Sequence, residues 1–256
     1  MNPNAEMMGR LIRLVEKGER AQRQSVDDFD WLQKHGIPFW LPNRLAGWVV
    51  SQFLHGERAT AEMCTLVAPR LNNSAASAFL NTQHLDEIRH AAIYERYLDK
   101  IGGLRPAPNY LASGYQAARE WNGPLEGILL AYHVLLEGES LILQHDVARW
   151  LPCPLFNQIA AVIARDEARH IAFGKLWLGQ VLPELNADQH AMIHCWLKGL
   201  WFDTVGSMIS RLKPFDFVNG AKPWGQWLDE NWTVREREMA SVGLIIDGKA
   251  AQSVAA

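Results

Sequence analysis

Apolar residues recur along most of the chain at intervals of three and four positions, which is the spacing of one helix face. The clearest segments of this kind cover residues 43–70, 74–101, 124–149 and 154–181. Weaker segments cover residues 5–23, 110–121, 187–211 and 224–240. Alternating runs of Val, Ile and Thr, which would indicate strands, are scarce. We therefore predict an all-α chain with four long helices.

Residues that end helices separate the four long segments. The Asn-Asn-Ser segment at 72–74 lies between the first and second, and Ser74 is placed to cap the second. Two glycines at 102–103 end the second helix, and a Pro-Cys-Pro segment at 152–154 divides the third from the fourth. The pattern predicts two helical hairpins joined by a long connection over about 102–123.

The two predicted hairpins also resemble each other in sequence. The similar segments are FLHGERA (53–59) with LLEGESL (135–141), and DEIRH (86–90) with DEARH (166–170). Glu57 and Glu139 are 82 positions apart, and Glu87 and Glu167 are 80 apart. Two nearly equal offsets predict a duplicated hairpin, and two such hairpins with one long crossover match a ferritin-like four-helix bundle.

Composition and charge narrow the functional classes. A net charge of −3 and a pI of about 6.3 give no sign of a nucleic-acid surface or of a polybasic membrane anchor. The longest uncharged stretch, residues 150–164, is too short to span a bilayer. Three cysteines without CxxC spacing argue against a disulfide framework and against a thiolate zinc site. We expect a cytoplasmic chain.

Two helical segments each carry a glutamate followed three positions later by a histidine. These pairs are Glu87 with His90 and Glu167 with His170. Residues at this spacing share a helix face, so each pair can bind one ion. A single pair is common on exposed helices, but two copies at a repeat offset are far more specific. A site rich in carboxylates and poor in imidazoles suits iron or manganese.

The hairpin geometry supports a shared site for two metal ions. Glu57 and Glu87 lie 30 positions apart, with their midpoint in the predicted turn at 72–74. Glu139 and Glu167 lie 28 apart, with their midpoint at Cys153 in the next turn. Antiparallel helices therefore bring each pair to one level. We predict that the metal ligands are Glu57, Glu87, His90, Glu139, Glu167 and His170.

Charged neighbours of the two histidines have a predicted supporting role. A ligating histidine normally donates its second ring N–H to a carboxylate. Asp86 and Asp166 are placed for this role, each across the hairpin pair. Arg89 and Arg169 are placed to hold these aspartates and to keep them ionised.

The third glutamate has an alternative, because Glu137 lies 30 positions before Glu167 and matches the first hairpin's spacing better. Two positions rotate a helix by about 200°, so only one of the two can face the metals. Glu139 is flanked by apolar residues, namely Tyr132, Leu135, Leu136, Ile142 and Leu143. The face of Glu137 carries polar residues, namely His133, Ser140 and Gln144. We therefore predict that Glu139, and not Glu137, is the glutamate ligand from the third helix.

Together these motifs resemble those of the di-iron carboxylate members of the ferritin-like superfamily. The chain is most similar to the hydroxylase large subunits of bacterial multicomponent monooxygenases, which act on methane, toluene or phenol. The resemblance covers roughly residues 45–180, although those subunits are longer and need partner subunits. It implies one iron at Glu57, Glu87 and His90. It implies a second iron at Glu139, Glu167 and His170.

The resemblance implies a non-haem di-iron monooxygenase or hydroxylase that uses O2 to oxidise a small organic substrate. Two iron ions are the expected cofactor, with manganese possible at one position. The chain has neither a GxGxxG loop nor a cysteine cluster, so a separate ferredoxin or flavoprotein reductase is expected to supply electrons. We expect a homodimer or small oligomer.

Other functions are open at this stage. Tyr94, one turn after His90, occupies the place of the radical tyrosine in ribonucleotide reductase small subunits, and is a candidate redox residue. An iron-storage protein resembling ferritin and a purely structural helical bundle are further alternatives. The chain after residue 181 is more than a ferritin needs, which argues against storage.

We expect one domain over residues 1–256, because both hairpins share the predicted metal site. Its bundle core covers about 43–181, and a helical cover rich in tryptophan covers about 186–240. Seven tryptophans are expected to form an apolar cover outside the core, namely Trp31, Trp40, Trp196, Trp201, Trp224, Trp227 and Trp232.

Overall fold

The computed structural model describes residues 3–34, 36–37, 43–150, 153–210 and 223–246, which form helices and no strand. This confirms the all-α prediction. The α-helices are α1 (Pro3–Ala21), α2 (Asn43–Val67), α3 (Ser74–Ile101), α4 (Asn109–Arg119), α5 (Leu125–Leu130), α6 (Glu137–Trp150), α7 (Pro154–Val181), α8 (Ala187–Trp201), α9 (Ser207–Ser210) and α10 (Trp224–Ser241). The short helical turns are η1 (Val26–Asp28), η2 (Ala68–Arg70), η3 (Ala131–Leu136), η4 (Leu182–Glu184) and η5 (Phe202–Gly206), of which η3 and η5 are π-helical.

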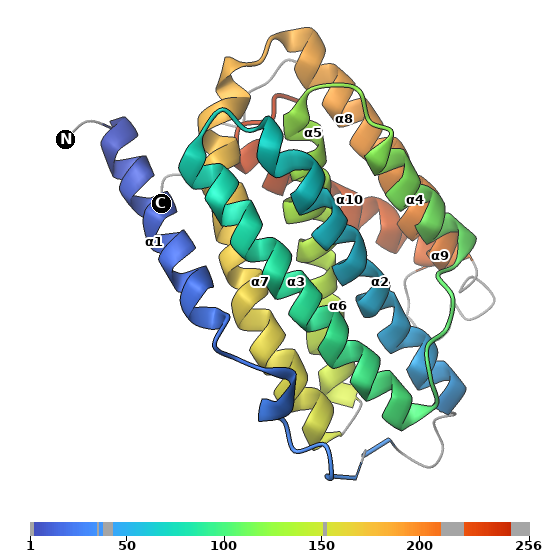
Figure 1. Cartoon of the computed structure of the whole chain (residues 1–256). Coiled ribbons are helices and arrows are strands. Elements are labelled where there is room, and N and C mark those ends of the chain that lie inside the picture. The colour runs from blue at the N-terminus through green and yellow to red at the C-terminus, as the bar shows by residue number, and fades with distance from the viewer. Residues whose placement is uncertain (1–2, 35, 38–42, 151–152, 211–222, 247–256) are drawn as a thin grey trace. The chain divides into compact units, whose positions relative to one another are not determined.

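Helices α2, α3, α6 and α7 run side by side as the expected four-helix bundle (Figure 1). Helices α2 and α3 form the first hairpin, and α6 and α7 form the second. Helix α5, the π-helical turn η3 and α6 follow one another without a break over residues 125–150. None of the helices in the described part of the chain is long and apolar enough to cross a membrane.

Local sequence explains where α3 begins and ends. Asn73 caps the helix, because its side chain accepts a hydrogen bond of 2.9 Å from the backbone N–H of Ala76. The prediction that Ser74 is the cap was therefore wrong by one position. At the other end Gly102 adopts a left-handed conformation with φ +117°, which a side chain would strain.

Aromatic side chains fill the interior of the bundle beside the charged centre. The ring of Phe53 on α2 stacks on Tyr94 of α3 at 5.6 Å and packs against Phe156 of α7 at 6.5 Å. Phe79 of α3 stacks on Phe173 of α7 at 4.1 Å. Burial of each such ring stabilises the fold by about 1.5–3 kcal/mol, so these contacts hold α2, α3 and α7 together.

Helix α1 packs closely on α3. A Cβ added at Gly18 would lie 2.6 Å from the hydroxyl oxygen of Thr82, so only glycine allows this approach. The close contact brings the end of α1 to the middle of α3, where Gln22 hydrogen-bonds Asp86.

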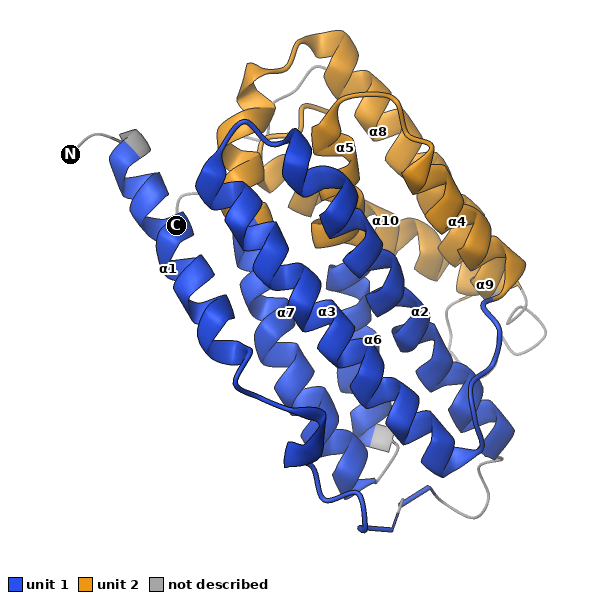
Figure 2. Ribbon diagram, viewed as in Figure 1, with its two compact units in different colours: residues 1–107, 136–173 blue, residues 108–135, 174–256 orange. Residues whose placement is uncertain are grey.

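The chain divides into two compact units (Figure 2). One unit comprises residues 1–107 and 136–173 and contains all the predicted metal ligands. The other comprises residues 108–135 and 174–256, where Trp121 stacks on Trp196 at 4.2 Å. The single domain over 1–256 stays a prediction.

The tryptophans of the predicted cover have several environments. In the second unit Trp201 and Trp232 are buried, with their rings 6.1 Å apart, whereas Trp224 and Trp227 are half-buried. Trp40 and residues 211–222 lie outside the described residues.

Candidate metal centre

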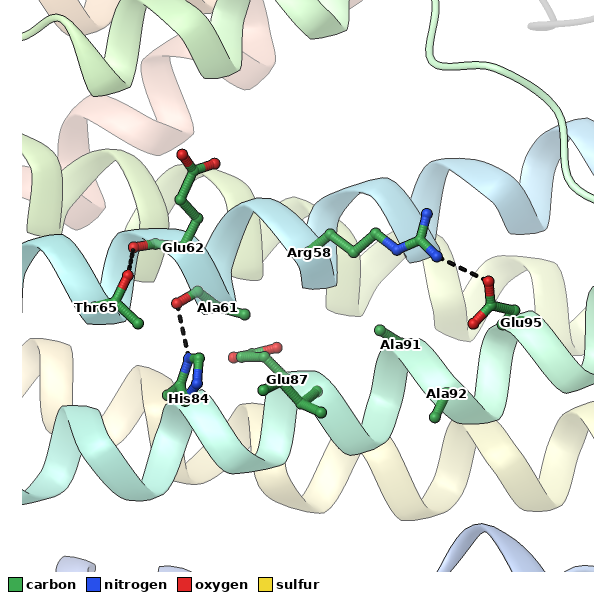
Figure 3. Close-up of a pocket in the computed structure, with 10 residues that line it drawn as sticks. Arg58, Ala61, Glu62, Thr65, His84, Glu87, Ala91, Ala92 and Glu95 are labelled. Carbon is green, nitrogen blue, oxygen red and sulfur yellow. Dashed lines mark hydrogen bonds and ion pairs between the residues drawn. The ribbon is translucent and has the colours of Figure 1, made fainter.

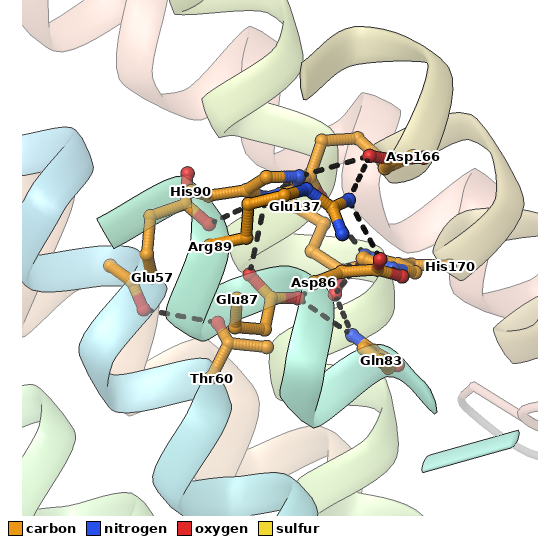
Figure 4. A network of polar contacts seen from close by, with 12 residues as sticks. Glu57, Thr60, Gln83, Asp86, Glu87, Arg89, His90, Glu137, Asp166 and His170 are labelled. Carbon is orange, nitrogen blue, oxygen red and sulfur yellow. Dashed lines mark hydrogen bonds and ion pairs between the residues drawn. The ribbon is translucent and has the colours of Figure 1, made fainter. Parts of the chain in front are cut away.

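Six acidic and imidazole side chains converge in the interior of the bundle (Figure 4). All of them are buried. They come from all four bundle helices, and they are Glu57 of α2, Glu87 and His90 of α3, Glu137 of α6, and Glu167 and His170 of α7.

The six side chains form two overlapping groups. Glu57 and His90 belong to the first group, Glu137 and His170 belong to the second, and Glu87 and Glu167 belong to both. Within each group, one potential ligand atom per residue lies within 4.8 Å of all the others. The arrangement therefore offers two adjacent positions for metal ions.

The two histidines turn the same ring nitrogen toward the glutamates. The Nδ1 atom of His90 lies 3.3 Å from Oε2 of Glu57 and 3.3 Å from Oε1 of Glu167. The Nδ1 atom of His170 lies 3.2 Å from Oε1 of Glu87 and 3.5 Å from Oε2 of Glu167. Both Nδ1 atoms therefore point into the centre of the cluster.

The other ring nitrogen of each histidine contacts an aspartate of the opposite hairpin. Nε2 of His90 lies 3.2 Å from Oδ2 of Asp166, and Nε2 of His170 lies 3.1 Å from Oδ2 of Asp86. An ionised carboxylate accepts but cannot donate, so each Nε2–H donates to its aspartate, and Nδ1 is the ring nitrogen directed at the position of a metal ion. These contacts across the hairpins agree with the sequence analysis.

Two arginines hold the aspartates in place. Arg89 donates to Asp86 at 2.8 Å and to Asp166 at 2.7 Å. Arg169 donates to Asp166 at 2.7 Å and also to Asp86. Gln22 adds a contact that the sequence did not reveal, since it donates to Asp86 at 2.6 Å and accepts from Arg89 at 3.0 Å.

Burial and mutual contacts shift the pKa values of the converging side chains. Burial, together with the neighbouring acids, raises the pKa of Glu57 and of Glu137 well above the usual value. Burial also disfavours ionisation of Glu87, but contacts with the histidines outweigh it and hold that pKa well below the usual value. The pKa values of His90 and His170 are raised, because contacts with carboxylates outweigh the effect of burial. The cluster thus favours added positive charge.

The residues present fit a pair of metal ions. No hydrogen bond reaches Oε2 of Glu137 or Nδ1 of His170 within the described residues, although both atoms are buried. Such atoms are costly to bury unless they bind a partner. Four carboxylates and two imidazoles form the kind of donor set that suits iron or manganese.

The structure brings Glu137, and not the predicted Glu139, together with the other predicted ligands. Glu137 is 3% exposed and belongs to the second group of ligands. Glu139 is half-buried and belongs to neither group.

The reason for this difference from the prediction lies in the helix before Glu137. Residues 131–136 form the π-helical turn η3, which breaks the regular periodicity, so residues before it do not show which way Glu137 faces. After η3 the polar Gln144 is buried at 1% exposure, whereas the apolar Ile142 is 48% exposed and Leu143 is 39% exposed. The polar face of α6 is the inner one.

Tyr94 lies in the aromatic core beside the cluster. Its ring is fully buried against Phe53, and its hydroxyl group has no hydrogen-bond partner among the described residues. Burial, together with the charge of Glu57, raises its pKa well above the usual value. These contacts suit a packing role, and a redox role for Tyr94 stays a prediction.

A groove of about 430 Å³ lies between α2 and α3 and reaches the cluster (Figure 3). Small residues, Ala61 and Ala91, help to line it. The exposed ion pair of Arg58 with Glu95, at 2.9 Å, also lies along it. Because the buried Glu87 contributes to the lining, the groove connects the exposed side of the hairpin with one of the shared glutamates.

Comparison with known proteins agrees with this geometry. A family model described as P-aminobenzoate N-oxygenase AurF matches residues 51–237, a range that contains all six converging residues. The chain belongs to the AurF family. No match was found among curated proteins.

Solved structures show the same fold as this AurF-family chain. A mutant of an R2-like ligand-binding oxidase with an anaerobically reconstituted Mn/Fe cofactor gives a TM-score of 0.72 at 16% identity, covering 89% of this chain and 92% of that one. A mutant of the same kind of oxidase with an aerobically reconstituted Mn/Fe cofactor gives a TM-score of 0.65 at 17% identity. That match covers 93% of this chain and 87% of that one. The expected ferritin-like di-iron carboxylate superfamily is confirmed, and the protein is an oxidoreductase of that class. The particular likeness to multicomponent hydroxylases is not confirmed.

Proposed function

We propose that this AurF-family protein is an O2-activating di-iron monooxygenase. The observation that carries the proposal is the pair of overlapping ligand groups that share Glu87 and Glu167. Glu57 and His90 would complete one metal position, and Glu137 and His170 would complete the other. Two bound iron ions would supply the binding and reduction of O2, which is chemistry that side chains alone do not perform.

The protein's own residues orient the ligands. Asp86 and Asp166 accept from Nε2 of the two histidines, which orients both rings with Nδ1 directed at the proposed metal positions. Arg89 and Arg169 cross-link the aspartates, so each hairpin supports the histidine of the other. This arrangement fixes the rings before any ion binds.

Packed aromatic residues lie directly beside the proposed metal positions. Phe79 lies edge-on to the ring of His170 at 6.2 Å and stacks on Phe173. The stacked rings of Phe53 and Tyr94 pack beside the cluster. Exclusion of water protects reactive species from side reactions, so the aromatic core supports an oxygenase role.

A small aromatic amine is the first substrate class to test, because the family model is described as a P-aminobenzoate N-oxygenase. The groove between α2 and α3 is a route for such a molecule, since it reaches Glu87. A ferredoxin or flavoprotein reductase would supply electrons, and a homodimer or small oligomer is the proposed assembly.

A radical-generating function based on Tyr94 fits less well. A redox tyrosine needs a nearby group to accept its proton, and the described residues place no hydrogen-bond acceptor at its hydroxyl. An electron paramagnetic resonance spectrum recorded after O2 exposure would show a tyrosyl radical if this alternative were correct.

The proposal is tested by anaerobic loading with Fe(II), a metal count, and reaction with ¹⁸O2, a chemical reductant and p-aminobenzoate. We expect two irons per chain and one labelled oxygen atom in the product. A double variant, Glu87→Ala with Glu167→Ala, is the matched control and is expected to bind no iron. Fewer than one iron per chain, or binding unchanged in the double variant, would contradict the metal site. Two irons without any labelled product would contradict the oxygenase activity on this amine.

A further inference from the structure

The internal repeat is broken beside the metal cluster. The Asp-Glu-x-Arg-His segment at 86–90 of α3 recurs 80 positions later in α7. Four positions before the glutamate, however, α3 carries Gln83 where α7 carries Ile163. Both side chains are fully buried. The two hairpins therefore differ at a buried position that lies one helical turn from a shared ligand.

Gln83 connects two of the glutamates (Figure 4). Its Nε2 atom donates to Oε1 of Glu137 at 2.6 Å and to Oε1 of Glu87 at 3.1 Å. An amide nitrogen donates and cannot accept, so its two hydrogens face the two glutamate oxygens and the orientation of the amide is fixed. The other oxygen of Glu137, Oε2, has no hydrogen bond among the described residues. The amide thus anchors one oxygen of Glu137 and leaves the second for an ion.

The equivalent position in the second hairpin offers no such anchor, because Ile163 has no hydrogen-bond donor. The glutamate related to Glu137 by the repeat is Glu57, whose Oε2 lies 3.3 Å from Nδ1 of His90. Glu57 belongs only to the first ligand group, and Glu137 belongs only to the second. An anchor on Glu137 therefore acts on one metal position more than on the other.

We propose that Gln83 is a positioning residue that makes the two metal positions unequal. By fixing Glu137 before metal arrives, it makes the position of Glu137 and His170 bind a divalent ion more tightly than the position of Glu57 and His90. Removal of a hydrogen-bond partner of a metal ligand typically lowers metal affinity by about 10–100-fold. The inference rests on the proposed function, because it requires that the cluster binds two ions.

The test is an anaerobic titration of the metal-free chain with Co(II), followed by calorimetry and by the visible absorption of the bound ion. The unmodified chain is expected to bind two ions in two unequal steps. Gln83→Leu removes both hydrogen bonds at similar volume, and the ratio of the two affinities is expected to fall by about 10–100-fold. Gln83→Leu also removes the hydrogen bond to Glu87, but Glu87 is shared, so any resulting loss of metal affinity affects both binding steps. The ratio of the two affinities therefore reports the effect on Glu137 alone. Ile163→Leu is the matched control and should leave both steps unchanged.

Two equal steps in the unmodified chain, or an unchanged ratio in Gln83→Leu, would overturn the inference. Failure of the unmodified chain to bind any ion would instead overturn the proposed function. Circular dichroism of the metal-free variant checks its fold, and Gln83→Met is the second variant if Gln83→Leu does not fold.

A measurement on the unmodified chain needs no substitution. One equivalent of Mn(II) is expected to give mainly a single mononuclear electron paramagnetic resonance signal. A statistical mixture of empty, singly loaded and coupled dinuclear chains would contradict unequal positions.

Discussion

The two hairpins of the bundle provide the same ligands but surround them differently. Glu57 and Glu137 lie 80 positions apart, as do His90 and His170. Each hairpin contributes an aspartate that holds the histidine of the other. In contrast, a π-helical turn precedes the ligand of α6, whereas α2 is α-helical throughout. The repeat thus keeps the residues that contact the ions and varies those that position them.

This difference separates two requirements of a dimetal site. Binding two ions requires the same donors from each half, and a duplicated hairpin supplies them with little change. Making one metal position chemically distinct from the other requires changes around those donors. The repeat contains such a change, because α3 carries Gln83 at the position where α7 carries Ile163. Substitutions at paired positions can test the two requirements separately.

The largest effect is expected where the two hairpins share ligands. Glu87 and Glu167 belong to both groups, so replacing both with alanine should abolish binding at both metal positions. The metal count after loading with Fe(II) measures this loss. Retention of even one tightly bound ion would show that each hairpin binds its ion independently.

The next effect distinguishes Glu137 from Glu139. Glu137→Ala should lower the affinity of one metal position by at least about 100-fold, because it removes a ligand and not merely a supporting contact. Glu139→Ala is the matched control on the same helix and should leave both metal affinities unchanged. Co(II) titrations of the two variants make the comparison, and the opposite result would restore Glu139 as the ligand.

The aspartates provide a paired test of the contacts across the hairpins. Asp86→Asn and Asp166→Asn each remove the carboxylate that holds one histidine, and each should weaken metal binding by about 10–100-fold. Asp86→Asn should lower the metal affinity of the position that includes His170. Asp166→Asn should lower the affinity of the position that includes His90. If each variant instead weakened the position of its own hairpin, the arrangement across the hairpins would be contradicted.

Loading with metal should stabilise both hairpins together. At an ion concentration of about one hundred times Kd, binding at one site adds about 2.7 kcal/mol to the free energy of unfolding. Chemical denaturation with and without Mn(II) measures this gain. The double variant of Glu87 and Glu167 should show no gain, and an equal gain in that variant would place the bound ions elsewhere.

The smallest effect is expected at Gln22, which supports only one of the two aspartates. Gln22→Ala removes hydrogen bonds to Asp86 and Arg89, and it should lower the free energy of unfolding by about 1–3 kcal/mol. Replacement of the exposed neighbour Arg23 by alanine is the control. Equal stability of the two variants would show that α1 contributes little to the charged network.

The sequence predicted most of the fold because helix periodicity and helix-ending residues are local signals. The predicted segments 74–101 and 154–181 agree with α3 and α7. The two Glu-x-x-His pairs could also be recognised from the sequence, because both residues of each pair lie on one helical turn. Glu137 was missed because a π-helical turn breaks the periodicity before it and because the inner face of α6 is polar.

One signal in the sequence favoured Glu137, but the apolar neighbours of Glu139 outweighed it in the prediction. Its offset from Glu57 is 80 positions, equal to that of Glu87 from Glu167, whereas Glu139 is offset by 82. Gln22 and Gln83 carried no comparable signal, because a lone glutamine has no characteristic spacing. Their roles depend on contacts between helices that lie far apart in sequence.

The central claim is that two metal ions lie between the hairpins, with Glu137 as a ligand. Anomalous diffraction from crystals loaded anaerobically with Fe(II), recorded on both sides of the iron absorption edge, tests this most directly. We predict two iron peaks inside the bundle, one bound to Nδ1 of His90 and the other to Nδ1 of His170, with Glu137 on the second. Absence of iron from the cluster, or iron bound by Glu139 in place of Glu137, would contradict the account.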